Sequence, residues 1–163
     1  MIYRISDHDG SNGVEPYILT PEVGLEPIYN GSSVFGVRPG NPLFFRLPVS
    51  GARPMTFTVE NLTEGLLFDS ARGLLTGVLT KEGTHSLSFG ATNASGETRF
   101  TVKLVAGEDI ALTPPMGWNS WNAWGSLVDA EKIRQAARAF IELGLADFGW
   151  SYINIDDGWQ TTG

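Results

Sequence analysis

The stretch TRFTVKLV, residues 98–105, alternates apolar and polar side chains. Phe100, Val102 and Leu104 would lie on one face of an extended chain, because successive side chains of a strand point to opposite faces. A period of two is typical of a strand with one buried and one solvent-facing side. The stretch therefore predicts β-structure for this part of the chain.

Five similar runs precede it. They are SVFGV (33–37), LFFRLPV (43–49), MTFTVEN (55–61), LLTGVL (74–79) and HSLSFGAT (85–92). Turn-forming segments rich in Gly, Pro, Asn, Asp and Ser separate the runs. Six or seven strands at this spacing, without a helical period, predict an all-β sandwich over residues 31–106. Residues 1–30, rich in Pro, Gly and acids, predict an extended strap before it.

The composition is that of a folded protein without cysteine chemistry. Of 163 residues, 42% are hydrophobic and 18% are charged, which is typical of a globular chain. The net charge of −7 argues against nucleic acid or an anionic membrane as a partner. No run approaches the ~20 apolar residues of a membrane span. Because the chain has no cysteine, it can form neither a disulfide framework nor a cysteine zinc site.

The last third of the chain has a different pattern. All five tryptophans lie there, after a predicted linker at residues 107–113 that runs into a Pro-Pro pair. Residues 129–145, DAEKIRQAARAFIELGL, have the apolar spacing of one helical face. The face consists of Ile133, Ala136, Ala137, Phe140, Ile141 and Gly144. Asp129 is the predicted N-cap, and Glu131 is favourable in the first turn.

A short apolar strand, YINI at residues 152–155, follows the predicted helix. A strand or loop, a helix and a strand in this order predict a βαβ unit and therefore a parallel sheet. Two strands and one helix cannot close a core, and a barrel of eight such units takes about 250 residues. Residues 114–163 therefore predict the incomplete start of a (β/α)8 TIM barrel, and we expect the chain to be the front end of a longer protein.

Two adjacent acids, Asp156 and Asp157, end this predicted strand. Asn154 and Asp156 share one face, which suits a barrel interior, and barrel enzymes place their sites at the carboxyl ends of the strands. Neighbouring acids point away from each other, so neither a shared metal ion nor a catalytic pair is expected. Two interpretations remain: a simple Asp-Gly turn, or carboxylates that accept hydrogen bonds from the hydroxyls of a polyol.

A tryptophan-rich segment, PPMGWNSWNAWG, opens the predicted barrel. Its indoles, Trp118, Trp121 and Trp124, are spaced by three residues and interleaved with Asn and Ser. Indoles stack on the apolar C–H face of a sugar and donate a hydrogen bond through their N–H. The alternative is that they merely fill the end of the barrel.

The early segment DHDGSNG imitates a calcium-binding loop. Asp7, Asp9 and Ser11 supply alternating oxygens. However, Asn12 occupies the glycine position of such a loop, and Ile18 occupies the position of its bidentate acid. We therefore expect no metal and no cofactor.

Two segments, TPPMGWNSWNAWG (113–125) and GLADFGWSYINIDDGWQ (144–160), flank a capped helix. In this order they resemble the opening of the α-galactosidase and α-N-acetylgalactosaminidase family of retaining glycoside hydrolases, family twenty-seven. The resemblance covers residues 112–160 and implies a TIM barrel. The β-rich segment 33–105 is similar to the immunoglobulin-like module that precedes the barrel in some bacterial members, and residues 14–38 resemble a strap associated with it.

The resemblance implies that Trp121, Asp156 and Asp157 bind the terminal galactoside ring, with the acids taking the hydroxyls at carbons four and six. Family catalysis uses two other Asp residues, a nucleophile on the fourth strand and an acid/base on the sixth, and neither is in this chain. Two positions depart from the family pattern. Trp150 stands where members usually have Tyr, and Gly158 stands where many eukaryotic members have Cys. The missing first-loop disulfide fits a bacterial branch.

These implications favour a fragment of a secreted or periplasmic hydrolase that cleaves terminal α-D-galactosides of oligosaccharides or polysaccharides with retention. The fragment alone is expected to be inactive. A second hypothesis is a non-catalytic β-sandwich that binds carbohydrate or acts as a spacer, with a remnant βα segment. The coding sequence after Gly163 separates the two, because further βα units would favour the enzyme.

Overall fold

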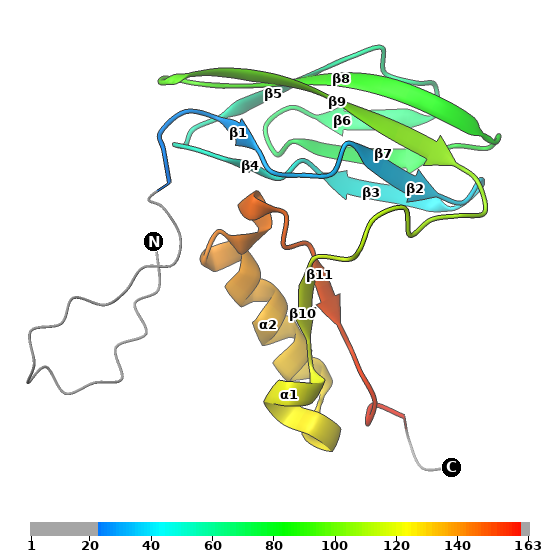
Figure 1. Cartoon of the computed structure of the whole chain (residues 1–163), viewed down its shortest axis with the longest axis vertical. Coiled ribbons are helices and arrows are strands. Elements are labelled where there is room, and N and C mark those ends of the chain that lie inside the picture. The colour runs from blue at the N-terminus through cyan, green and yellow to red at the C-terminus, as the bar shows by residue number, and fades with distance from the viewer. Residues whose placement is uncertain (1–22, 161–163) are drawn as a thin grey trace, which may run out of the picture.

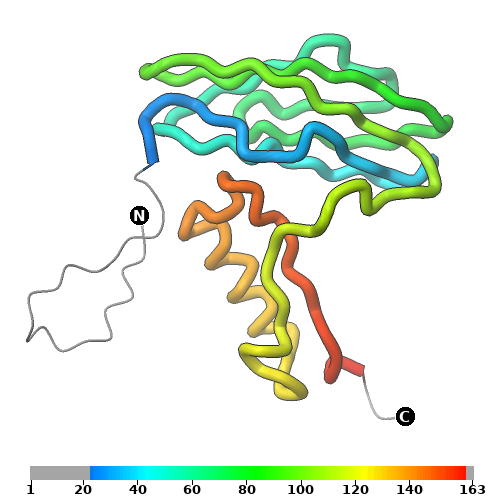
Figure 2. The backbone as a smooth tube through the Cα atoms, viewed as in Figure 1, coloured from blue at the N-terminus to red at the C-terminus, as the bar shows by residue number. Residues whose placement is uncertain are grey.

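The computed structural model describes residues 23–160, which form two parts (Figure 1). The first is a β-sandwich that extends to Ala106, and the second is a βαβ unit that begins at Gly117. Figure 2 follows the backbone from one part into the other through residues 107–116, which form neither helix nor strand. Most of the predicted strap, and the acidic segment with Asp7, Asp9 and Ser11, lie outside the described residues.

The larger sheet of the sandwich has four strands in the order β2-β9-β8-β5. They are β2 (Val34–Val37), β5 (Thr56–Glu60), β8 (Gly83–Asn93) and β9 (Gly96–Ala106). β8 and β9 form a long antiparallel hairpin, β5 pairs antiparallel with β8, and β2 pairs in parallel with β9. The hairpin therefore forms the centre of this sheet.

The second sheet has three antiparallel strands in the order β3-β7-β6. They are β3 (Pro42–Arg46), β6 (Leu66–Asp69) and β7 (Leu74–Val78). A separate short antiparallel pair joins β1 (Ile28–Tyr29) to β4 (Val49–Ser50). The single run predicted at residues 43–49 is thus divided between β3 and β4, on either side of Pro48, which has no N–H for a ladder hydrogen bond. β6 was not among the predicted runs.

The hydrophobic core lies between the two sheets, and every buried apolar residue among residues 23–160 belongs to the sandwich. The core residues are Val37, Leu43, Leu47, Val49, Met55, Phe57, Leu66, Leu75, Leu79, Leu87, Phe89, Ala91, Val102, Leu104 and Ala106. In β9 the buried Val102 and Leu104 alternate with the exposed Thr101 and Lys103, so the predicted period of two is confirmed. Because apolar burial is the dominant favourable term in folding, the sandwich carries its own source of stability.

Tyr29 joins the short β1 strand to the larger sheet. Its ring stacks on that of Phe100, with centroids 3.8 Å apart, and its hydroxyl donates to the carbonyl oxygen of Ser32 at 2.6 Å. Burial raises the pKa of Tyr29 to about 12. The hydroxyl therefore remains a protonated donor throughout the neutral pH range.

The second part contains a parallel strand pair, β10 (Gly117–Asn119) and β11 (Tyr152–Asn154), with the helix α2 (Ala130–Glu142) between them in sequence. A short helix, α1 (Trp121–Trp124), and two 3-10 turns, η1 (Gly125–Leu127) and η2 (Leu145–Phe148), complete the connections. The predicted parallel pairing is confirmed, whereas the larger barrel remains a prediction.

The helix α2 begins as the sequence predicts. Asp129 is its N-cap: one carboxylate oxygen accepts from the backbone N–H of Lys132 at 2.9 Å, and the other accepts from Nζ of Lys132 at 2.8 Å. The hydrogen bond from the Lys132 side chain, supported by the bond from its backbone, lowers the pKa of the Asp129 carboxyl. The charged form of Asp129 therefore stabilises the first turn.

The apolar face of α2 is only partly covered within the described residues. Ile133, Ala136 and Phe140 are half-buried, whereas Ala137 and Ile141 are exposed, and Ile141 retains 62% of its accessible surface. No residue of α2 is fully buried. The described helices are all too short or too polar to cross a membrane.

Candidate functional site

The candidate site lies where β10 and β11 end. The two strands run side by side away from the sandwich, so their carboxyl ends and α1 lie at the far end of the molecule (Figure 1). Asn119 and Asn154 are register partners at this end. Parallel pairing therefore brings the GWNSW segment next to the DDGW segment, although more than thirty residues separate them in sequence.

Asp156 is held at this end by three groups. Its backbone N–H donates to Oγ of Ser120 at 3.0 Å, and Ser120 is fully buried. Its Oδ2 accepts from Nδ2 of Asn119 at 2.8 Å, and its Oδ1 accepts from the backbone N–H of Asp157 at 2.7 Å. All donors to the carboxylate are neutral, and its side chain is exposed.

Asp157 lies in a sharp bend of the chain. Its Oδ1 accepts from the backbone N–H of Gly158 at 2.8 Å, and its side chain is exposed. Gly158 has a φ of +85°, and a Cβ atom there would lie 2.7 Å from Cα of Ser126. Only glycine adopts this conformation at such close approach without strain. The chain therefore bends sharply at Asp157 and Gly158, and both carboxylates are exposed to solvent.

Neither acid has a cationic partner in the part of the chain that the structure describes. None of the ion pairs among residues 23–160 involves Asp156 or Asp157. The same residues contain no cluster of three or more His, Asp or Glu side chains that could hold a metal ion. Two carboxylates whose hydrogen-bond donors are neutral can accept further hydrogen bonds from hydroxyl groups of a ligand.

The three clustered tryptophans separate into a packed pair and an exposed ring. Trp118 and Trp124 meet edge to face, with ring centroids 5.0 Å apart. Trp121 is 47% exposed, and its backbone N–H donates to Oδ1 of Asn119 at 2.9 Å. The packing interpretation therefore suits Trp118 and Trp124, whereas the ring of Trp121 is exposed enough to stack on a ligand.

Two residues of the site were not singled out by the sequence analysis. The Asn119 amide bridges the site, because it donates to Asp156 and accepts from Trp121. Ser120 joins the strand ends, because its N–H donates to the carbonyl oxygen of Asn154 and its hydroxyl accepts from Asp156. Their only sequence signal was their place between the tryptophans of GWNSW.

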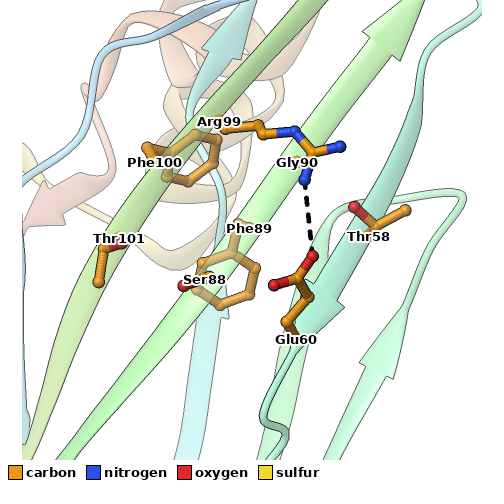
Figure 3. Close-up of a pocket in the computed structure, with 8 residues that line it drawn as sticks. All are labelled: Thr58, Glu60, Ser88, Phe89, Gly90, Arg99, Phe100 and Thr101. Atoms are coloured by element: carbon orange, nitrogen blue, oxygen red, sulfur yellow. Dashed lines mark ion pairs between the residues drawn. The ribbon is translucent and has the colours of Figure 1, made fainter.

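A hollow of about 260 Å³ lies on the larger sheet of the sandwich, apart from the candidate site (Figure 3). Arg99 and Glu60 form an ion pair of 3.5 Å across it, beside Thr58 and Gly90. The two aromatic lining residues are engaged in packing, because Phe89 is 2% exposed and the ring of Phe100 stacks on Tyr29. The hollow therefore offers hydroxyls and paired charges but no exposed ring on which a sugar could stack.

No protein-family model matches the chain. Over 57 residues it is 50% identical to "Probable alpha-galactosidase B" of Talaromyces emersonii, a match that covers 35% of this chain and 13% of that protein. Over 64 residues it is 44% identical to "Alpha-galactosidase" of Coffea arabica, which covers 39% of this chain and 17% of that protein. The matched regions thus span only a small part of the length of these relatives.

A solved structure matches much more of the chain. A "putative alpha-galactosidase" of Bacteroides fragilis NCTC 9343 is 41% identical, with a TM-score of 0.81, and the match covers 87% of this chain and 31% of that one. The sandwich alone and the βαβ unit alone are each shorter than 87% of the chain, so the match includes both parts. The two parts are therefore arranged similarly in both structures. The chain is therefore similar in sequence and structure to part of proteins named as α-galactosidases.

Proposed function

We propose that the chain is the amino-terminal part of an α-galactosidase of the retaining type, in which an immunoglobulin-like sandwich precedes a (β/α)8 barrel. The observation that supports the proposal is the hydrogen bonding at the carboxyl ends of β10 and β11, where Asn119 donates to Asp156 and accepts from the backbone N–H of Trp121. Asp157 follows Asp156 directly in the chain. Barrel enzymes build their sites at this end of the strands. The similarity to proteins named as α-galactosidases supports the same conclusion.

In this proposal the three residues bind the terminal galactoside ring. The exposed Trp121 stacks on its apolar face. Asp156 and Asp157 accept hydrogen bonds from the hydroxyls at carbons four and six, and ionised acceptors make the stronger kind of hydrogen bond. The nucleophile and the acid/base come from later strands of the barrel, so this part supplies binding and no catalytic group.

The uncovered surface of the βαβ unit supports its place in a larger barrel. Ala137 and Ile141 form an exposed apolar strip on α2, and no residue of α2 is fully buried. In a (β/α)8 barrel the helices form a continuous outer ring, and neighbouring helices cover such apolar strips. The proposed boundaries are 31–106 for the sandwich, 107–113 for a linker and 114–163 for the start of the barrel.

The proposed substrate class is supported by the names of the similar proteins. The proposed ligands are terminal α-galactosides of oligosaccharides or polysaccharides. We also propose a secreted or periplasmic protein, as the sequence analysis expects. N-acetylgalactosamine and arabinopyranose are the related sugars to be compared with galactose.

The test is hydrolysis of 4-nitrophenyl α-D-galactoside by the full-length gene product that contains this chain. We expect release of nitrophenol from the α-anomer and not from the β-anomer, and none from residues 1–163 alone. A full-length product that folds and cleaves no α-galactoside, α-N-acetylgalactosaminide or β-arabinopyranoside would refute the proposal. Binding of polysaccharide without hydrolysis would favour the non-catalytic β-sandwich module.

A further inference from the structure

Asp147 connects the two parts of the molecule at the end opposite the candidate site. It lies on η2, just before β11, and Figure 1 shows this orange segment facing the sandwich. Its Oδ1 pairs with Nη2 of Arg46 on β3 at 2.6 Å, and its Oδ2 pairs with Nη2 of Arg53, just after β4, at 2.9 Å. One carboxylate of the βαβ unit therefore binds two guanidinium groups of the sandwich.

The ion pairs are partly shielded from water. The Asp147 side chain is 24% exposed and that of Arg46 is 36% exposed. Nη1 of Arg46 is buried and has no hydrogen-bond partner among the described residues, whereas Nη2 donates to Asp147. Arg53 is further fixed by its donation to the carbonyl oxygen of Val49 at 3.0 Å. Shielded, charge-assisted pairs are stronger than exposed ones, because water and salt screen them less.

The backbone beside Asp147 also fits the sandwich closely. Nδ2 of Asn30 donates to the carbonyl oxygen of Asp147 at 2.9 Å and to Oγ of the buried Ser50 at 3.0 Å. Gly149 has a φ of +87°, and a Cβ atom there would lie 2.8 Å from the carbonyl oxygen of Asn30. Any other residue would be strained and would push the two parts away from each other.

We propose that Asn30, Arg46 and Arg53 form a docking face on which the amino-terminal side of the barrel's first βα unit is fixed. The sandwich then serves as a rigid base for this unit, on the side opposite the sugar site, and does not itself reach the substrate. The proposal extends the function above and does not depend on the identity of the sugar, because it concerns contacts within the chain. The shared arrangement in the Bacteroides fragilis protein supports it.

The tryptophans make the docking directly measurable in the 163-residue chain. All five lie in the βαβ part, from Trp118 to Trp159, so their fluorescence reports the unfolding of that part alone. Hydrogen exchange of the β8 and β9 amides reports the sandwich. The two readouts can therefore be followed separately in the same sample.

Asp147→Asn keeps the shape of the side chain and removes its charge. We expect the amides of α2 and η2 to exchange roughly ten-fold faster, which corresponds to about 1.4 kcal/mol, while β8 and β9 exchange as before. The urea midpoint from fluorescence should fall as well. Asp109→Asn, an exposed residue between the two parts, is the matched control and should change neither readout.

Arg53→Gln removes one of the two pairs and provides a milder variant if Asp147→Asn fails to fold. Its effect should be smaller, and in the double variant Arg53→Gln, Asp147→Asn the two effects should not add, because both remove the same contact. Unchanged exchange of α2 and η2 in both single variants, or fully additive effects, would overturn the proposal.

Discussion

Asp147 and the pair Asp156–Asp157 lie at opposite ends of the same short strand, β11, and their surroundings differ in charge. Asp147 binds two arginines at 2.6 and 2.9 Å and is largely shielded. Asp156 and Asp157 are exposed and receive hydrogen bonds from an amide and from backbone N–H groups. Aspartate side chains therefore take on different roles according to whether they form an ion pair with an arginine of the protein.

The comparison gives a physical criterion for function. A carboxylate whose charge is compensated within the protein contributes to the stability of its surroundings. A carboxylate held by neutral donors keeps its net charge and its remaining lone pairs for a ligand. By this criterion we infer that the amino-terminal end of β11 is structural, and we propose its carboxyl-terminal end as the binding site.

A large effect that distinguishes the two ends is expected from their tryptophans. In the full-length protein, Trp121→Ala should lower kcat/KM by roughly 30-fold, or about 2 kcal/mol, because the loss of the ring removes apolar contact with the sugar. Trp150→Ala is the matched control: this ring is 42% exposed but lies at the amino-terminal end of β11. Equal losses of kcat/KM in the two variants would contradict the assignment of the ends.

A smaller effect is expected from Asn119, which orients both Asp156 and the start of α1. Asn119→Ala should raise KM for the galactoside and lower kcat/KM by roughly five-fold, about the net value of one hydrogen bond. Asn122→Ala, an exposed residue of α1, is the control and should leave the kinetics unchanged. An Asn119→Ala protein with unaltered kinetics would show that the bridge does not position the site.

The smallest effect concerns Asp129, which caps α2 away from both ends. The pKa of the Asp129 carboxyl is lower in the folded chain than in the unfolded chain. The charged carboxylate therefore stabilises the fold fully above the unfolded-state pKa, and this stabilisation is lost as the pH falls through the folded-state pKa. Exchange of the first-turn amides of α2, corrected for the intrinsic rate, should rise several-fold on acidification from pH 6 to pH 3. Asp129→Asn keeps a capping side chain and should abolish most of this dependence. An unchanged pH dependence in the variant would exclude Asp129 as its source.

The elements with a clear periodicity could be predicted from the sequence. The alternation in residues 98–105 and the capped helix starting after Asp129 both appear as expected, because each depends on local side-chain order. The division of the run 43–49 at Pro48 and the parallel pairing of β2 with β9 were not foreseen, because strand partners are chosen by contacts distant in sequence.

Only those features of the candidate site that depend on local residue order could be predicted from the sequence. β11 ends at Asn154, so Asp156 lies just beyond the carboxyl end of the strand. The order of residues along the chain is local information and was sufficient to indicate this position. The bridge from Asn119 spans 37 positions, and the pairs of Asp147 with Arg46 and Arg53 span 101 and 94, so no short motif could indicate them. Such contacts require the three-dimensional arrangement.

The most direct test of the account is the role of Asp156 in the full-length protein. Asp156→Asn keeps the side-chain shape but removes a charged acceptor, and hydrogen bonds to charged groups are worth ~1.5–3 kcal/mol. The account predicts that kcat/KM for 4-nitrophenyl α-D-galactoside falls by about 10- to 200-fold, and that added azide does not restore it. Rescue by azide with an inverted glycosyl azide as product would make Asp156 the nucleophile, and near-wild-type kinetics with lowered stability would make it a turn residue only; either result would contradict the account.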